Sequence, residues 1–89
     1  MFSLAASIGR TPLVELPRLS PRPSVRLFAK METSGPTGSI KDRVALALIR
    51  DAERSGRLKP GGTIVEASSG NTAIALGALG RSLGYRVRV

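Results

Sequence analysis

The chain has no cysteine and no histidine among its 89 residues. Without cysteine it can form no disulfide, no thiolate metal site and no cysteine nucleophile. Without histidine it can carry neither a histidine-based catalytic triad nor a histidine-bound zinc ion. The 6 acidic residues are scattered, so no carboxylate pair or hard-metal cluster is indicated. The sequence therefore predicts no metal site and excludes catalysis by a thiol or an imidazole.

Aromatic residues and long apolar runs are also scarce. Aromatics make up 3% of the chain, which argues against nucleic acid as a partner because single-strand binding uses aromatic platforms. The longest apolar runs fall far below the roughly 20 residues of a membrane span. Residues 1–7 lack the basic start and the length of a signal peptide. We therefore expect a cytoplasmic protein with no membrane partner.

The length and the charge set further bounds. Eighty-nine residues allow one small domain at most, with a modest core. The formal net charge is +8, but the 14 basic residues are spread from Arg10 to Arg88 without a consecutive run. Scattered basic residues are typical of a solvated surface, and a piece separated from an acidic remainder has the same appearance.

A helix is predicted over about residues 40–55. Ser39 and Asp42 have capping-box spacing, in which each side chain satisfies a free backbone N–H of the first turn. Gly56 supplies the stop. The apolar residues expected on the buried helical face are Val44, Ala45, Leu48, Ile49 and Ala52.

The second half of the chain predicts a strand, a helix and a strand in succession. Residues 63–67 form a β-branched run, a helix is expected from Asn71 or Thr72 to about Gly84, and residues 85–89 begin a further strand. This order implies a parallel strand pair joined by a right-handed crossover. The fold class predicted is therefore α/β, with a parallel βαβ unit.

Lys41 is the first residue of interest for chemistry. It lies in the first turn of the predicted helix, where the partial positive charge of the helix end disfavours a second positive charge. That field favours the neutral amine, which is the nucleophilic form. The alternative is a solvent-facing lysine, which is what most lysines are.

The run from Ser68 to Thr72 forms a small polar loop between the predicted strand and helix. Free backbone N–H groups at a helix start bind anions, and Gly70 permits close backbone approach. The hydroxyls and the amide of Asn71 add donors, so a carboxylate or a phosphate is a suitable ligand. The alternative is an ordinary helix-capping turn.

Taken in order, these runs resemble the fold-type II enzymes that use pyridoxal 5'-phosphate (PLP), above all the cysteine synthases and cystathionine β-synthases. The resemblance extends over nearly the whole chain, with matching order and spacing. The segments that carry it are Ile8–Leu13, Pro36–Arg43, Asp51–Gly56, Leu58–Gly61 and Ser69–Thr72. Within the family, the Leu-Ser-Pro stretch and Phe28–Glu32 are most similar to an actinobacterial cysteine synthase that uses O-phosphoserine.

The resemblance implies a role for each candidate residue. Lys41 would hold PLP covalently and later move a proton at the substrate α-carbon. Asn71 would hydrogen-bond the ring oxygen of the cofactor and, with Ser68, Ser69 and Thr72, form the loop that binds the substrate α-carboxylate. The reaction would be β-replacement on O-acetylserine or O-phosphoserine, with sulfide or carrier-bound sulfur as donor, in a homodimer when complete.

The chain also departs from the family pattern. Gly35 stands where relatives often have asparagine, and Ala67, Ser68 and Ala73 replace proline, threonine and glycine in the substrate loop. Family enzymes are several times longer, and their PLP-phosphate loop and the residue facing the pyridine nitrogen lie downstream. We therefore expect an N-terminal fragment of a three-layer α/β sandwich that folds poorly and does not catalyse by itself.

In the family architecture, residues 1–34 would supply strands to the larger domain, and residues 35–89 would begin the smaller one. Two strands are predicted in the first part, at residues 13–16 and 25–32, separated by a proline-rich loop. By this resemblance, both would lack their sheet partners.

Two other functions are compatible with these residues. One is a cystathionine β-synthase or a serine/threonine dehydratase in the same fold, although the Asp-Arg pair after Lys41 favours the synthase branch. The other is a non-catalytic remnant or a basic binding module, which the net charge of +8 motivates.

Overall fold

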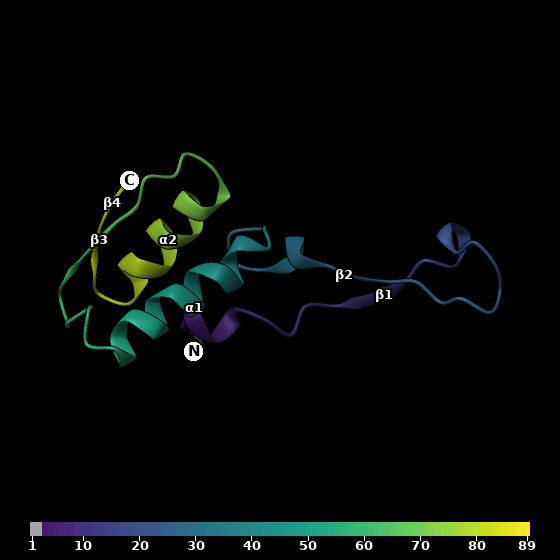
Figure 1. Ribbon diagram of the computed structural model, residues 1–89, viewed down its shortest axis with the longest axis horizontal. Coiled ribbons are helices and arrows are strands. Elements are labelled where there is room, and N and C mark those ends of the chain that lie inside the picture. The colour runs from purple at the N-terminus through teal and green to yellow at the C-terminus, as the bar shows by residue number, and fades with distance from the viewer. Residues whose placement is uncertain (1–2) are drawn as a thin grey trace.

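The computed structural model describes residues 3–89 and has a compact body with a thin arm, measuring 52 × 30 × 22 Å overall (Figure 1). The arm holds two strands and the body holds two helices and two strands. In chain order the elements are β1 (Leu13–Glu15), β2 (Phe28–Lys30), α1 (Lys41–Arg54), β3 (Thr63–Val65), α2 (Asn71–Ser82) and β4 (Arg86–Arg88). Short 3₁₀ turns occupy Ala5–Ser7, Pro17–Leu19 and Glu32–Ser34.

The βαβ unit predicted for the second half of the chain is confirmed. Strands β3 and β4 pair in parallel, with Ile64 opposite Val87, and α2 connects them. The mixed α/β class is therefore as expected. The strands are shorter than predicted, and each covers three residues.

Gly80 on α2 is the point where the helix approaches the β3–β4 pair most tightly. A Cβ added there would lie 2.6 Å from Val87 Cγ2 and 3.2 Å from Ile64 Cδ1. A Cβ added at Gly77 on the same helix would meet nothing within 4 Å. Side chains of β3 and β4 therefore pack directly on the helix backbone at Gly80 but not at Gly77.

Gly80→Ala and Gly77→Ala are expected to change stability in opposite directions. Overpacking at Gly80 should lower the free energy of unfolding by about 1–3 kcal/mol. Alanine at Gly77 should raise it by about 0.5–1 kcal/mol, because glycine is a poor helix former. Urea denaturation followed by circular dichroism measures both; destabilisation of equal size at the two positions would contradict the packing described.

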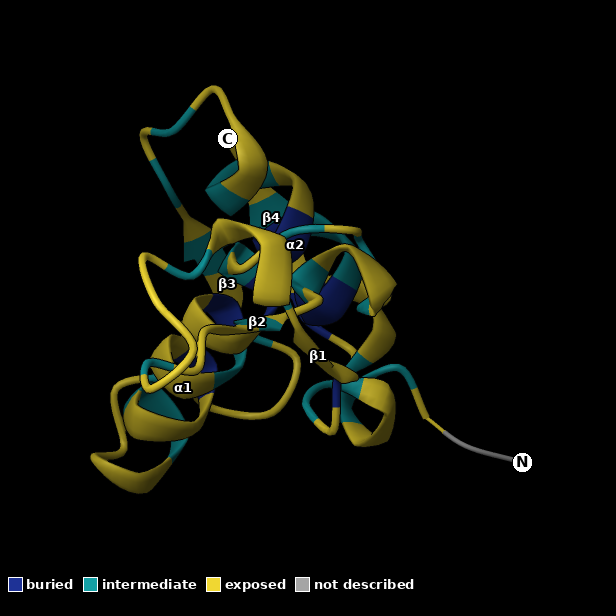
Figure 2. Ribbon diagram, turned by 90° about the vertical axis from the view of Figure 1, so that its right-hand side faces the viewer, coloured by how far each residue is buried: buried dark blue, intermediate teal, exposed yellow. Residues whose placement is uncertain are grey.

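The core lies between the two helices and continues to the start of β4 (Figure 2). Its fully buried side chains come from both helices and from the residue before β4: Ala45, Ile49, Ala75, Leu76, Leu79 and Tyr85. The predicted apolar face of α1 is wrong in part, since Val44 is 38% exposed and Leu48 is 50% exposed. Helix α2 packs against α1, and that packing buries Ala45 and Ile49 while Val44 and Leu48 stay more than a third exposed.

A hydrogen bond joins the far end of α1 to Tyr85, the residue before β4. Helix α1 ends as predicted before Gly56, which adopts a φ of 78°. The Tyr85 hydroxyl donates to the Glu53 carboxylate. That bond, followed by one from Arg50, lowers the pKa of Glu53, and the same carboxylate raises the pKa of Tyr85.

This pair is expected to make the stability depend on pH at both ends of the scale. The lowered pKa of Glu53 contributes stability above its ordinary value of 4.5, lost as the pH falls through the folded-state value. The raised pKa of Tyr85 contributes stability below 10.0, lost as the pH rises through its folded-state value. Between the folded-state pKa values of Glu53 and Tyr85, the melting temperature of Tyr85→Phe should lie furthest below that of the parent. Below and above this range the two melting temperatures should converge. A difference independent of pH would contradict this linkage.

The arm contains the two strands predicted for the first part of the chain, which pair with each other, a pairing that the sequence analysis did not predict. Strands β1 and β2 are antiparallel, with Val14 opposite Ala29. Backbone bonds from Leu16 N to Leu27 O and from Met31 N to Pro12 O, both 2.9 Å, extend the pairing. The arm's apolar side chains nevertheless remain exposed on both faces (Figure 2).

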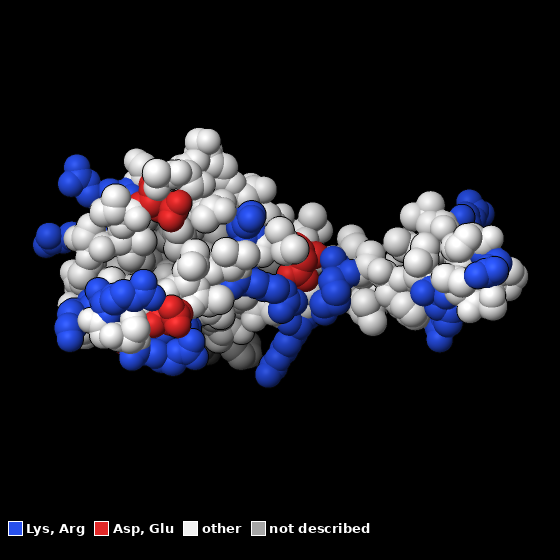
Figure 3. All heavy atoms as spheres, viewed as in Figure 1, with Lys and Arg blue, Asp and Glu red and all other residues white. Residues whose placement is uncertain are grey.

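The surface carries basic side chains on the body and on the arm alike, as the sequence predicted (Figure 3). The far smaller number of acidic side chains lies among them. Neither helix within residues 3–89 is long and apolar enough to cross a lipid bilayer.

Candidate active site

Lys41 is the first residue of α1, and its side chain is half-buried. Its backbone N–H donates to Ser39 Oγ over 3.1 Å, so the Ser39 hydroxyl satisfies a first-turn N–H as predicted, although the cap residue of α1 is Ile40. The other half of the predicted capping box is wrong. The Asp42 carboxylate accepts from the backbone N–H (3.2 Å) and the hydroxyl of Thr37, and not from Ser39. The turn before the helix folds back far enough for Thr37 to take the position expected of the cap residue.

Arg43 anchors the same helical turn to the N-terminal segment. Its guanidinium donates two hydrogen bonds to the Glu32 carboxylate, which also accepts from the hydroxyl of the buried Thr11. These bonds, with Arg43 the largest cause, lower the pKa of Glu32. Sequence reasoning missed this network because its members are up to 32 positions apart and match no local motif.

The two charged residues after Lys41 are thus engaged, and the amine of Lys41 itself is not. Among residues 3–89 it takes part in no hydrogen bond or ion pair. By contrast, Lys30 Nζ donates to Thr11 O over 2.6 Å. Lys41 is half-buried as a residue, and an amine without a partner among residues 3–89 is available to a ligand.

The loop from Ser68 to Thr72 joins the end of β3 to α2, as predicted. Gly70 is the cap residue of α2 and supplies no side-chain bond. Ser68 and Thr72 are half-buried, whereas Ser69 and Asn71 are exposed. In the part of the chain that the structure describes, none of these four side chains makes a hydrogen bond, so the first-turn N–H groups of α2 and the hydroxyls beside them are open to an anion.

Both helices begin on the side of the body that faces the arm, and they pack against each other (Figure 1). Two positive helix ends therefore lie at one end of the body, one carrying an amine and the other a loop of hydroxyl and amide donors. PLP fits this pair of features, since its aldehyde needs an amine and the carboxylate of an amino-acid substrate needs an anion site. Lys41 could hold the cofactor, and the Ser68–Thr72 loop could hold the substrate.

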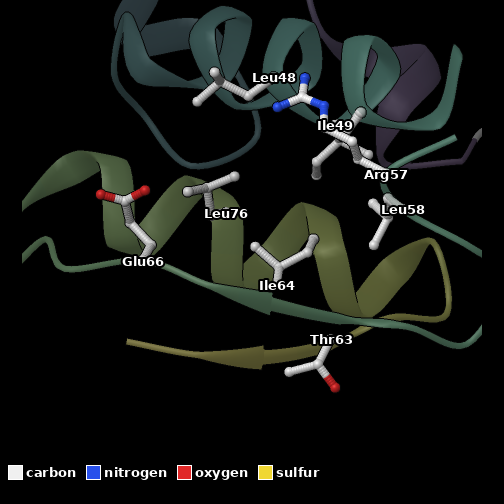
Figure 4. Close-up of a pocket in the computed structure, with 9 residues that line it drawn as sticks. Leu48, Ile49, Arg57, Leu58, Thr63, Ile64, Glu66 and Leu76 are labelled. Atoms are coloured by element: carbon white, nitrogen blue, oxygen red, sulfur yellow. The ribbon is translucent and has the colours of Figure 1, made fainter. Parts of the chain in front are cut away.

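A hollow of about 230 Å³ elsewhere on the body does not include these residues (Figure 4). It lies between α1 and β3, and apolar side chains such as Leu48, Ile49, Ile64 and Leu76 line most of it. Neither Lys41 nor any of the four loop residues borders it. No lysine lines the hollow, so it has no amine to hold PLP and is not the candidate site.

A family model, curated relatives and a solved structure all match this chain to PLP-dependent enzymes. The model of the family "Pyridoxal-phosphate dependent enzyme" matches residues 4–89. Cysteine synthase B of Salmonella typhimurium is 46% identical over all 89 residues, and O-ureido-L-serine synthase of Streptomyces lavendulae is 49% identical over 84 residues, or 94% of this chain. The crystal structure of the Entamoeba histolytica cysteine synthase superposes with a TM-score of 0.85 over 98% of this chain, at 43% identity.

These matches cover only part of each relative. The chain spans 29% of the Salmonella enzyme, 26% of the Streptomyces enzyme and 27% of the Entamoeba structure. Its own residues, in contrast, are matched almost from end to end, including the starts of both helices. The chain therefore belongs to the family of pyridoxal-phosphate dependent enzymes and is homologous to the cysteine synthases.

Proposed function

We propose that this chain forms the first part of the active site of a PLP-dependent enzyme that replaces the β-substituent of an activated serine with sulfur. The observation that carries the proposal is the Lys41 amine at the start of α1, which has no partner among residues 3–89, together with the donor loop at the start of α2 on the same side of the body. The 46% identity to a cysteine synthase over the whole chain supports it. Because the chain spans 29% of that relative, the activity is proposed for the complete protein.

Each residue would contribute a defined step. Lys41 would bind the cofactor through its amine and, once released by the substrate, move a proton at the substrate α-carbon. Ser68, Ser69 and Thr72, with the N–H groups of the α2 first turn, would orient the α-carboxylate. Asn71 would donate a hydrogen bond to the ring oxygen of the cofactor. Bound PLP withdraws electrons from the α-carbon, while the protein supplies positioning.

We propose the domain assignment on similar grounds. Residues 1–34 would belong to the larger domain of the complete protein, and residues 35–89 would begin the smaller one. The separation of the two sheets supports this division, since β1 pairs with β2 in the arm and β3 with β4 in the body. The exposed side chains of Leu13 and Phe28 on the arm suit burial in a larger sheet structure.

The identities of the activated serine and of the sulfur donor are more specific proposals than the reaction type. We favour O-acetylserine or O-phosphoserine as substrate and sulfide or carrier-bound sulfur as donor, in a homodimer. Cystathionine β-synthase and dehydratase activities are the competing possibilities. Product analysis with sulfide and each of O-acetylserine, O-phosphoserine and free serine separates them: cysteine from either ester supports the proposal, whereas a keto acid from serine would favour a dehydratase.

The cofactor site can be tested by covalent trapping. PLP is added to the 89-residue chain, and also to a chimera in which the chain replaces the matching segment of the Salmonella cysteine synthase B. Both are then reduced with borohydride and mapped by mass spectrometry. The chain has three lysines, and we expect the adduct at Lys41 and not at Lys30 or Lys59. An adduct mainly at either of the other two would refute the assignment.

The substrate loop predicts a different kinetic effect. In the chimera, Thr72→Val removes a hydroxyl from the proposed carboxylate site without changing the side-chain volume much. We expect KM for the amino-acid substrate to rise about tenfold, the effect of one hydrogen bond to a charged group. Trapping of PLP at Lys41 should be unchanged. A loss of PLP trapping with unaltered KM would place Thr72 at the cofactor instead.

A further inference from the structure

We propose that Asp42, the residue after Lys41, is a positioning residue: by binding Thr37 it fixes the backbone from which the Lys41 side chain extends. This inference rests on the function proposed above, in which that amine binds the cofactor. Asp42 would touch neither cofactor nor substrate.

Asp42 is 3% exposed, which is rare for an aspartate unless its charge is paired or hydrogen-bonded. Its two partners come from one residue, since one carboxylate oxygen accepts the Thr37 N–H over 3.2 Å and the other accepts the Thr37 hydroxyl. Hydrogen bonds to an ionised acceptor are roughly twice as strong as neutral ones. A buried carboxylate therefore fastens α1 to the preceding turn at the position next to Lys41.

The turn that receives this contact is itself closed. Gly38 N donates to Gly35 O over 3.1 Å, and Gly35 N donates to Glu32 O over 3.2 Å. On the other side of Lys41, Ser39 Oγ accepts the Lys41 backbone N–H. Ser39 before Lys41 and Asp42 after it both hold the backbone by hydrogen bonds. The Cα of Lys41, from which its side chain extends, is therefore fixed in position.

Gly35 makes the contact sterically possible. A Cβ added at Gly35 would overlap a carboxylate oxygen of Asp42. That oxygen is the end of a side chain and could move aside, but only by leaving Thr37. Gly35 is one of the positions at which the sequence departs from the family pattern, and the structure explains why a side chain is disfavoured there in this chain.

Four variants test the proposal by the rate at which acetic anhydride modifies Lys41, relative to Lys59 in the same molecule. Each of three variants weakens the contact: Asp42→Asn removes the charge and one acceptor oxygen, Thr37→Val removes the hydroxyl, and Gly35→Ala displaces the carboxylate without altering either partner. We expect the Lys41:Lys59 ratio to rise about tenfold in all three, the equivalent of one lost charge-assisted hydrogen bond. Thr37→Ser keeps the hydroxyl and should leave the ratio unchanged.

Circular dichroism at the temperature of the reaction confirms that each variant is folded, so that a general loss of structure is not mistaken for release of Lys41. An unchanged ratio in Asp42→Asn and Gly35→Ala, or equal effects of Thr37→Ser and Thr37→Val, would overturn the proposal. Acetylation requires no PLP. If the parent traps no PLP at Lys41 but the ratio still rises in the three variants, the proposed function fails while the hold of Asp42 on Lys41 stands.

Discussion

Replacing Lys41 with alanine is expected to lower kcat of the chimera with the Salmonella enzyme by about 10²–10⁴-fold, the usual contribution of a positioned acid–base group. Lys41→Ala removes the amine that would bind the cofactor and move the proton at the α-carbon. Its half-buried position and lack of a partner within residues 3–89 make a structural role a weak alternative. Steady-state cysteine production measures the effect, and absorbance of bound PLP reports loss of the covalent link.

Two matched substitutions sharpen this test. Lys59→Ala removes an exposed lysine from the loop before β3, and activity should be retained. Lys41→Arg preserves the positive charge but cannot supply a neutral amine, so it should be as inactive as Lys41→Ala. Substantial activity in Lys41→Arg would show that the charge matters and not the nucleophile, which would contradict the proposed role.

Leu79→Ala is expected to produce the largest loss of stability, about 2–5 kcal/mol. Leu79 is 1% exposed and lies in the core between α2 and α1. At about 0.05–0.15 kcal/mol per residue, a chain of 89 residues has only about 4–13 kcal/mol of total stability. One cavity could therefore unfold the chain at ordinary temperatures. Urea denaturation or a shift in melting temperature measures the change.

Ile74→Ala on the same helix is the control. Ile74 is 57% exposed, so its truncation should change the free energy of unfolding by no more than about 0.5 kcal/mol. If Ile74→Ala were as destabilising as Leu79→Ala, the exposed face of α2 would have to be covered in solution, by a second copy or by further chain. Repeating the measurement over a range of protein concentrations tells these two apart.

The helices were predictable because their signals are local. Capping by Ser39, the stop at Gly56 and the spacing of apolar residues in α1 all act within a few residues, and the observed helix differs from the predicted one by a single residue at each end. The strand–helix–strand order likewise implied the parallel β3–β4 pair. The predicted site residues Lys41 and Ser68–Thr72 also lie at helix starts, as expected.

Contacts between distant segments were less predictable. The apolar spacing of α1 predicted that Val44, Leu48 and Ile49 are all buried. Only Ile49 is buried, because burial depends on where α2 lies. The pairing of β1 with β2 was missed because the family resemblance assigned both strands to a sheet outside this chain.

The sequence by itself determined the helix positions, the βαβ order, the candidate residues and the family, since each depends on residue identity at short or fixed spacing. Only the tertiary structure decided which partner Asp42 takes, how Arg43 reaches Glu32, and that the starts of α1 and α2 lie on the same side of the body. The physical reason is that a helix cap or a turn is selected within a few residues, whereas a buried carboxylate or an apolar face takes whatever partner the packing of the whole chain brings to it.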